Sequence, residues 1–156
     1  AVIAEAEALM KTLDGEATEA VVLAADERLR GLAAVTGPAI GAIGFSLGGA
    51  WAFHLSQVRP DDVAAVVTVY GAGEGDFSTA KAAYLGHFAE NDDYEDAAYV
   101  RELEGMIRDA GLEVTFHFYP NTGHWFVEPN RPDVYNAAAA ELVWERTLAF
   151  FRERLA

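Results

Sequence analysis

Apolar residues recur along this chain at two spacings, one typical of strands and the other of helices. Unbroken or alternating apolar runs predict four strands, over residues 39–45, 63–70, 83–89 and 114–119. Helical spacing predicts helices over residues 1–13, 16–32, 47–58 and 97–110, and from about 138 to 155. Because the strands alternate with helices, we expect one α/β domain over residues 1–156, with a mainly parallel sheet flanked by helices.

Size and charge exclude several classes of protein. The chain has 156 residues, 52% of them hydrophobic, and a formal net charge of −14, so we expect a globular protein that binds neither nucleic acid nor a membrane. It has no cysteine, which excludes disulfides and thiolate metal sites. No secretory signal pattern is found, so we expect a cytoplasmic protein. Residues 31–58 carry no charge, but Pro38 and six glycines favour a strand, a turn and a helix over a membrane span.

A serine lies where the first predicted strand meets the next helix. The sequence Gly44-Phe45-Ser46-Leu47-Gly48 has the spacing of a nucleophile elbow, a sharp turn that raises a serine hydroxyl above a sheet. We expect side chains at Gly44 or Gly48 to collide with the adjoining strand or helix. The backbone N–H of Leu47 would lie at the positive end of the helix, where it can bind an oxyanion. Taken alone, the motif is equally compatible with a glycine-rich turn that only packs a helix onto a sheet.

The ends of two later strands carry groups that could activate this serine. Ser46 follows the first strand, an acidic loop over residues 90–96 follows the third, and His124 follows the fourth. Reactive groups of an open parallel sheet gather at the carboxyl ends of its strands, and the order serine, acid, histidine is that of the α/β-hydrolases. An imidazole can take the serine proton, and a carboxylate can fix the tautomer of that imidazole.

Both partners of the serine have alternatives. His124 is favoured as the base because the other histidines fall within a predicted helix or strand: His54, His87 and His117. For the acid, Asp92 and Asp93 lie closest to the strand end, Asp96 is better placed as a helix N-cap, and Asp76 lies in another loop. A calcium loop is disfavoured because the required glycine at its sixth position and glutamate at its twelfth are missing.

Three separate segments resemble the dienelactone hydrolase family, and residues 138–151 resemble the last helix of that family. The segments are Gly44 to Ala50, Leu85 to Asp92, and Tyr119 to Phe126. The resemblance implies an α/β-hydrolase fold and the cleavage of a small ester or lactone without a cofactor or a metal.

The resemblance also implies roles for individual residues. Ser46 would be the nucleophile, Asp92 the orienting acid and His124 the base. Leu47 would donate half of the oxyanion hole. We further expect three residues to contact the substrate: Phe45, Trp125 and Arg131.

The sequence departs from this family at three points. The founding members have a cysteine at the position of Ser46. The arginine that helps to hold the substrate carboxylate in the family is replaced by Glu128, although Arg131 lies nearby. The first four strands of the family fold are not found, and the loop after the third of them normally gives the second oxyanion donor.

We therefore expect the C-terminal part of the fold, in which the strand over residues 39–45 has an open apolar edge. Such an edge invites strand pairing, so we expect a homo-oligomer or a partner that covers it. The alternative to an enzyme is a non-catalytic remnant of the hydrolase fold that acts as an interaction module or needs a complementary N-terminal part.

Overall fold

The computed structural model describes residues 2–156 and contains each predicted helix and strand. Their bounds are α1 (Val2–Met10), α2 (Gly15–Arg30), β1 (Ile40–Phe45), α3 (Leu47–Val58), β2 (Val63–Val69), β3 (Ala83–Ala89), α4 (Ala97–Asp109), β4 (Val114–Tyr119) and α5 (Ala137–Arg154). The opening helix ends three residues earlier than predicted, because residues 11 and 12 form a turn. Ala1, the first residue of that prediction, lies outside the described residues, as does the side chain of Ile3.

The chain forms two compact units, one up to Thr36 and the other from Gly37 to Ala156. The first unit holds α1 and α2. Asp14 caps α2, since its carboxylate accepts the backbone N–H of Ala17 at 3.1 Å, and Gly31 closes the helix. None of the helices within residues 2–156 is both long enough and apolar enough to span a membrane.

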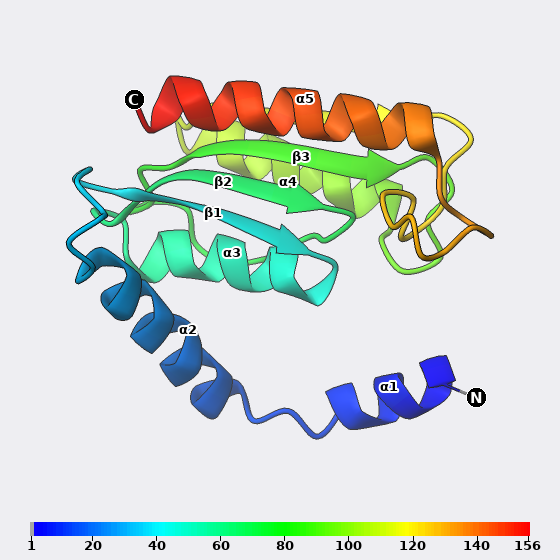
Figure 1. Cartoon of the computed structure of the whole chain (residues 1–156), viewed down its shortest axis with the longest axis horizontal. Coiled ribbons are helices and arrows are strands. Elements are labelled where there is room, and N and C mark those ends of the chain that lie inside the picture. Colours follow the sequence, from blue (N-terminus) through cyan, green and yellow to red (C-terminus); the bar gives the residue numbers. More distant parts are fainter. Residues whose placement is uncertain (1) are drawn as a thin grey trace. The chain divides into compact units, whose positions relative to one another are not determined.

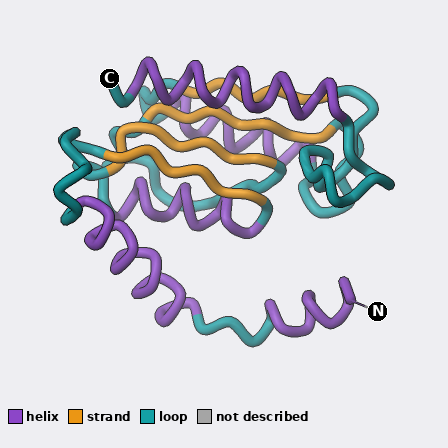
Figure 2. The backbone as a smooth tube through the Cα atoms, in the orientation of Figure 1, coloured by secondary structure: helices purple, strands orange, loops and turns teal. Residues whose placement is uncertain are grey.

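The second unit is built on a parallel sheet of four strands in the order β1-β2-β3-β4 (Figures 1 and 2). The connections through α3 and α4 advance across the sheet in the same direction, so right-handed crossovers place both helices on one face. Figure 1 shows α5 running along the opposite face. This arrangement confirms the predicted α/β fold with a parallel sheet between helices.

Each face of the sheet is covered by its own apolar core. Under α3, the ring of Phe53 stacks on that of Tyr84, with centroids 5.6 Å apart. Across the sheet, α5 packs Val143 against a buried cluster that includes Val67 and Phe126. Strands β2 and β3 are buried on both faces, which explains why their sequences are almost wholly apolar.

A polar network interrupts the core beneath α5. His87 on β3 is completely buried, and its ring nitrogens lie 2.8 Å from the Tyr119 hydroxyl and 3.1 Å from the Thr147 hydroxyl. Burial, followed by the nearby His117 and Arg146, lowers the pKa of His87 to about 3. The imidazole is therefore neutral in the folded protein at physiological pH, and both of its nitrogens have partners.

We expect this histidine to make the folded protein less stable in acid. The unfolded chain protonates His87 below pH of about 6.5, whereas the folded chain resists protonation down to about pH 3. Between these values the unfolded state binds more protons, so the free energy of unfolding falls by up to ~1.4 kcal/mol for each unit of decreasing pH. Urea unfolding across this range should show a shallower pH dependence for His87→Gln than for the wild type. Equal slopes would contradict the prediction.

Candidate active site

Ser46 occupies the turn between β1 and α3 in a strained backbone conformation. Its φ angle is +49°, in the region that favours glycine. The backbone N–H of Ser46 donates to the carbonyl of Val69 at the end of β2, at 3.0 Å, and the N–H of Gly49 donates to the Ser46 carbonyl at 2.8 Å. The strain is thus held by hydrogen bonds to the neighbouring strand and helix.

Close backbone contacts surround this turn. A Cβ atom at Gly44 would lie 2.0 Å from the Gly48 carbonyl oxygen, and one at Gly71 would lie 2.1 Å from the Ser46 carbonyl oxygen. The predicted collision at Gly44 is therefore confirmed. The prediction for Gly48 is wrong, because a Cβ there would meet nothing within 4 Å. The close approach falls on the next residue, Gly49, where a Cβ would lie 2.3 Å from the Thr68 hydroxyl.

The three side chains selected from the sequence meet at the carboxyl ends of the strands. His124 Nε2 lies 2.9 Å from Ser46 Oγ, and His124 Nδ1 lies 2.9 Å from both carboxylate oxygens of Asp92. Only 2% of the His124 side chain and 3% of the Asp92 side chain are exposed. An ionised Asp92 fixes the proton on Nδ1, so Nε2 accepts a hydrogen bond from the Ser46 hydroxyl.

Asp92 is held as a carboxylate by several donors. Burial by itself would raise its pKa, but the hydrogen bond from His124 and those from the backbone N–H groups of Tyr94 (2.9 Å) and Glu95 (3.2 Å) outweigh burial and lower it. Burial raises the pKa of the neighbouring Glu95, and the negative charge of Asp92 raises it further.

The other acids weighed from the sequence lie elsewhere. Asp93 is exposed. Asp96 caps α4 as predicted, accepting the backbone N–H groups of Ala98 at 2.7 Å and of Tyr99 at 2.9 Å. Asp76 accepts the N–H of Ser78 within its own loop at 2.8 Å. Of these acids, Asp92 is the one hydrogen-bonded to His124.

Aromatic rings surround the His124 imidazole. The ring centroids of Tyr70, Tyr94 and Trp125 lie 4.7, 4.8 and 4.7 Å from that of His124. The Tyr70 hydroxyl donates to Glu128 at 2.9 Å, and burial, followed by the contact with Glu128, raises the pKa of Tyr70. Sequence analysis did not select either tyrosine, although Tyr70 directly follows a strand end, the position that was searched for reactive groups.

The residues expected to contact substrate border this cluster. Phe45 is 37% exposed, and its ring lies 6.2 Å from that of Tyr70. Trp125 has a φ angle of +66° and carries the Arg131 guanidinium 4.7 Å above its ring. Arg131 also donates two hydrogen bonds to Asp133, at 3.2 and 2.9 Å, so its charge already has a partner.

Two further features bear on the chemistry that the site can perform. Leu47 is the first residue of α3, and the N–H groups of a first helical turn have no partner inside the helix. This N–H can therefore donate to an oxyanion next to Ser46. Among the side chains that the structure describes, no group of three histidine or acidic residues is arranged to hold a metal ion.

A parallel sheet with a serine on a strained strand-to-helix turn defines the α/β-hydrolase class of fold. The model of the Dienelactone hydrolase family matches residues 2–155. The chain belongs to this family, as the sequence resemblance implied.

Individual relatives agree with this assignment. A carboxymethylenebutenolidase from Rhodococcus opacus is 31% identical over 130 residues, covering 74% of this chain and 50% of that protein. Protein usf from Aquifex pyrophilus is 29% identical over 119 residues, covering 74% of this chain and 52% of that protein. The chain thus spans about half the length of these curated relatives. The crystal structure of a dienelactone hydrolase-like promiscuous phosphotriesterase from metagenomic libraries superimposes with a TM-score of 0.79 at 21% identity, over 86% of this chain and 60% of that one.

The glycines of the turn should differ sharply in their tolerance of alanine. Gly48→Ala places its methyl group in open space within a helix, so we expect a melting temperature equal to or above that of the wild type, with up to ~1 kcal/mol gained from helix propensity. Gly44→Ala forces β1 and α3 apart, and we expect a loss of about 2 kcal/mol or more. Thermal unfolding measures both. Equal melting temperatures for the two variants would contradict the packing described for this turn.

Proposed function

We propose that this chain is a serine hydrolase that cleaves a small carboxylic ester or lactone through an acyl-enzyme. The observation that carries the proposal is the continuous hydrogen-bonded series from Ser46 through His124 to Asp92, with all three contacts at 2.9 Å. Membership of the dienelactone hydrolase family supports it. The strained turn, which raises the serine next to a helix N-terminus, supports it independently.

In the proposed reaction, Ser46 Oγ attacks the carbonyl carbon while its proton passes to His124 Nε2. The negative charge on the carbonyl oxygen is stabilised by the N–H of Leu47. When the tetrahedral intermediate collapses, the ester C–O bond breaks and the imidazolium returns its proton to the leaving alkoxide. Water then attacks the acyl-enzyme with His124 as general base, which releases the acid and regenerates Ser46. Asp92 keeps the imidazole in the required tautomer throughout.

The charges around the site favour a neutral substrate. Glu128 lies where the family has an arginine for the substrate carboxylate, and its carboxylate accepts the Tyr70 hydroxyl close to His124. Arg131, the nearby cation that could substitute, is paired with Asp133. A substrate with a free carboxylate would meet Glu128 without an unpaired cation to offset it, so we propose an uncharged ester or lactone.

Labelling with a fluorophosphonate probe tests the proposed roles. Such a probe reacts only with an activated serine, so we expect labelling of the wild type and none of Ser46→Ala. Asp92→Asn removes the group that fixes the imidazole, and we expect its labelling rate to fall by about 10³- to 10⁴-fold. The matched variant Asp93→Asn changes an exposed neighbour and should label at the wild-type rate. An unlabelled wild type, or equal rates for the two asparagine variants, would refute these roles and favour the non-catalytic alternative.

A second proposal concerns the open side of the sheet. Among the described residues, no strand other than β2 pairs with β1, which leaves the second edge of β1 without a neighbouring strand. We infer that a further strand pairs with this edge, from a second copy of the chain or from another segment. In the family fold the strands on this side carry the second oxyanion donor, so a segment that supplied those strands would also complete the site.

The surface next to this edge supports the proposal because it is apolar. On β1, Ile43 is 38% exposed and Phe45 is 37% exposed. The ring of Phe45 lies 6.2 Å from that of Trp144 on α5, which is 44% exposed, and Leu148 one turn later is 47% exposed. Contiguous exposed apolar side chains of this kind mark interaction surfaces.

We expect the isolated chain to self-associate through this surface. Sedimentation should show a species larger than one chain, and Leu148→Lys should shift it toward the monomer by placing a charge on the apolar face. Leu142→Lys is the matched control, because Leu142 is similarly exposed at 42% but lies on another side of α5 from Trp144 and Leu148. A wild-type monomer with an intact sheet, or equal effects of both variants, would contradict the proposal.

A further inference from the structure

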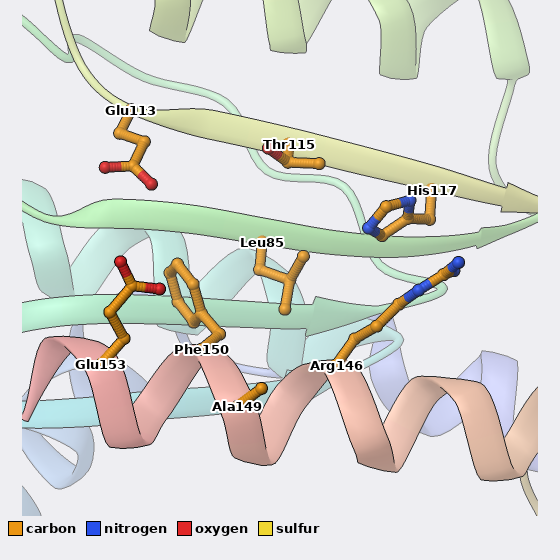
Figure 3. A pocket seen from close by; sticks show the side chains of 8 residues that line it. All are labelled: Leu85, Glu113, Thr115, His117, Arg146, Ala149, Phe150 and Glu153. Carbon is orange, nitrogen blue, oxygen red and sulfur yellow. The ribbon is translucent and has the colours of Figure 1, made fainter.

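A pocket lies away from the serine, between α5 and the edge strand β4 (Figure 3). Its volume is about 270 Å³. Figure 3 shows its two ends: His117 and Arg146 lie at one, and Glu113 and Glu153 at the other. The pocket follows β4 from its amino end to His117, whereas the serine site lies beyond the carboxyl ends of the strands. The two sites are therefore separate.

Arg146 is the cation at one end of this pocket, in an acidic chain that has 25 acidic and 11 basic residues. Its Nη1 donates to the Tyr119 hydroxyl at 3.0 Å, and its guanidinium lies 5.5 Å from the centroid of the Tyr119 ring. Within the described part of the chain, the guanidinium of Arg146 forms no ion pair with a carboxylate. By contrast, Arg108 and Arg154 each contact a glutamate. The remaining N–H groups of Arg146 are thus available to an anion.

The Arg146 side chain is held in place by the buried network beneath it. The Tyr119 hydroxyl accepts from Arg146, so it can donate its own proton to Nδ1 of the neutral His87. The opposite nitrogen of His87 then donates to the Thr147 hydroxyl at 3.1 Å. Because Tyr119 is held in turn by His87, this series of hydrogen bonds orients the guanidinium before any ligand arrives.

His117 supplies a second donor at the same end of the pocket. Its ring lies 5.9 Å from that of His87 in a stacked arrangement, and it forms no hydrogen bond with any described residue. A neutral imidazole always carries one N–H, so His117 can donate to an oxygen beside Arg146. Together the two side chains can bind both oxygens of a carboxylate.

The rest of the pocket limits what such an anion can carry. Between the two ends, the pocket is mostly apolar: Leu85, Ala149 and Phe150 line it there, with Thr115 on β4 as the polar side chain (Figure 3). At the far end, Arg154 pairs with both Glu113 and Glu153, so these carboxylates already have a cation. The middle of the pocket therefore favours a ligand with a hydrocarbon body. The end with Glu113 and Glu153 has no free cation for a second anionic group of the ligand, and no free carboxylate for an amine.

We propose that this pocket binds a small monocarboxylate through Arg146 and His117, with its hydrocarbon part against Phe150 and Leu85. The observations that carry this proposal are an oriented guanidinium without a carboxylate partner, a second donor beside it, and an apolar cavity adjoining both. Binding here is independent of the reaction proposed at Ser46.

Benzoate is a suitable probe because it combines one carboxylate with a compact apolar ring. Titration of the full chain, followed by amide chemical shifts in two-dimensional NMR, should give saturable shifts in residues 113–117 and 146–153, with a Kd in the millimolar range. The neutral analogue benzamide should bind at least about tenfold more weakly, since it cannot form the charged pair. Inorganic phosphate should also bind more weakly, because it has no group for the apolar middle.

Two substitutions on α5 separate this site from non-specific binding. Arg146→Gln should weaken benzoate binding at least about tenfold, and Arg146→Lys, which keeps the charge without the planar fork, should lie between it and the wild type. Arg152→Gln removes an equal charge from the same helix outside the pocket and should leave the Kd unchanged. The proposal would be overturned if benzoate and benzamide bound equally, or if phosphate bound more tightly than benzoate. It would also be overturned if the shifts centred on Ser46, or if Arg146→Gln and the wild type had equal Kd values for benzoate.

Discussion

The close backbone approach around Ser46 is the constraint on which the rest of the site depends. Neither Gly44 nor Gly71 has room for a Cβ atom. At Gly44 the Cβ would lie 2.0 Å from the carbonyl oxygen of Gly48, and at Gly71 it would lie 2.1 Å from the carbonyl oxygen of Ser46, far closer than packed atoms can approach. This contact locks the end of β1 against α3 and β2, and it maintains a serine at positive φ against a cost of order 1–3 kcal/mol. The backbone of Ser46 is thereby fixed by main-chain packing.

The imidazole is positioned by a different kind of interaction. His124 lies on a loop, so its orientation depends on side chains: Asp92 holds one nitrogen, and the rings of Tyr70 and Trp125 limit its rotation. Asp92 is itself fixed by backbone donors from its own loop, including the N–H of Tyr94. The Ser46 hydroxyl and the His124 imidazole meet at 2.9 Å because parallel strands deliver both loops to one edge of the sheet.

The sequence could predict what depends on local pattern. Apolar runs located all four strands, and the order of polar residues after them identified Ser46 and His124. It could not separate Asp92 from Asp93 without the family resemblance, because adjacent residues at a strand end differ only in the direction of their side chains. It also assigned a collision to Gly48 that belongs to Gly49, since a motif gives the spacing of glycines but not which of them faces the strand. The Arg146 pocket was missed because it joins a helix face to strand positions 29 or more residues earlier in the chain.

The two edges of the sheet differ in a way that bears on assembly. Strand β4 ends the sheet with Thr115 exposed and is preceded by the exposed Glu113, and polar or charged groups on an edge discourage pairing with another strand. Strand β1 carries no charged or polar side chain, and exposes Ile43 and Phe45 next to an apolar stripe of α5. If both edges faced water in the working protein, β1 would need the same protection as β4. The asymmetry therefore favours β1 as the edge that receives a further strand, and β4 as a solvent-facing edge on which a small-molecule pocket can remain open.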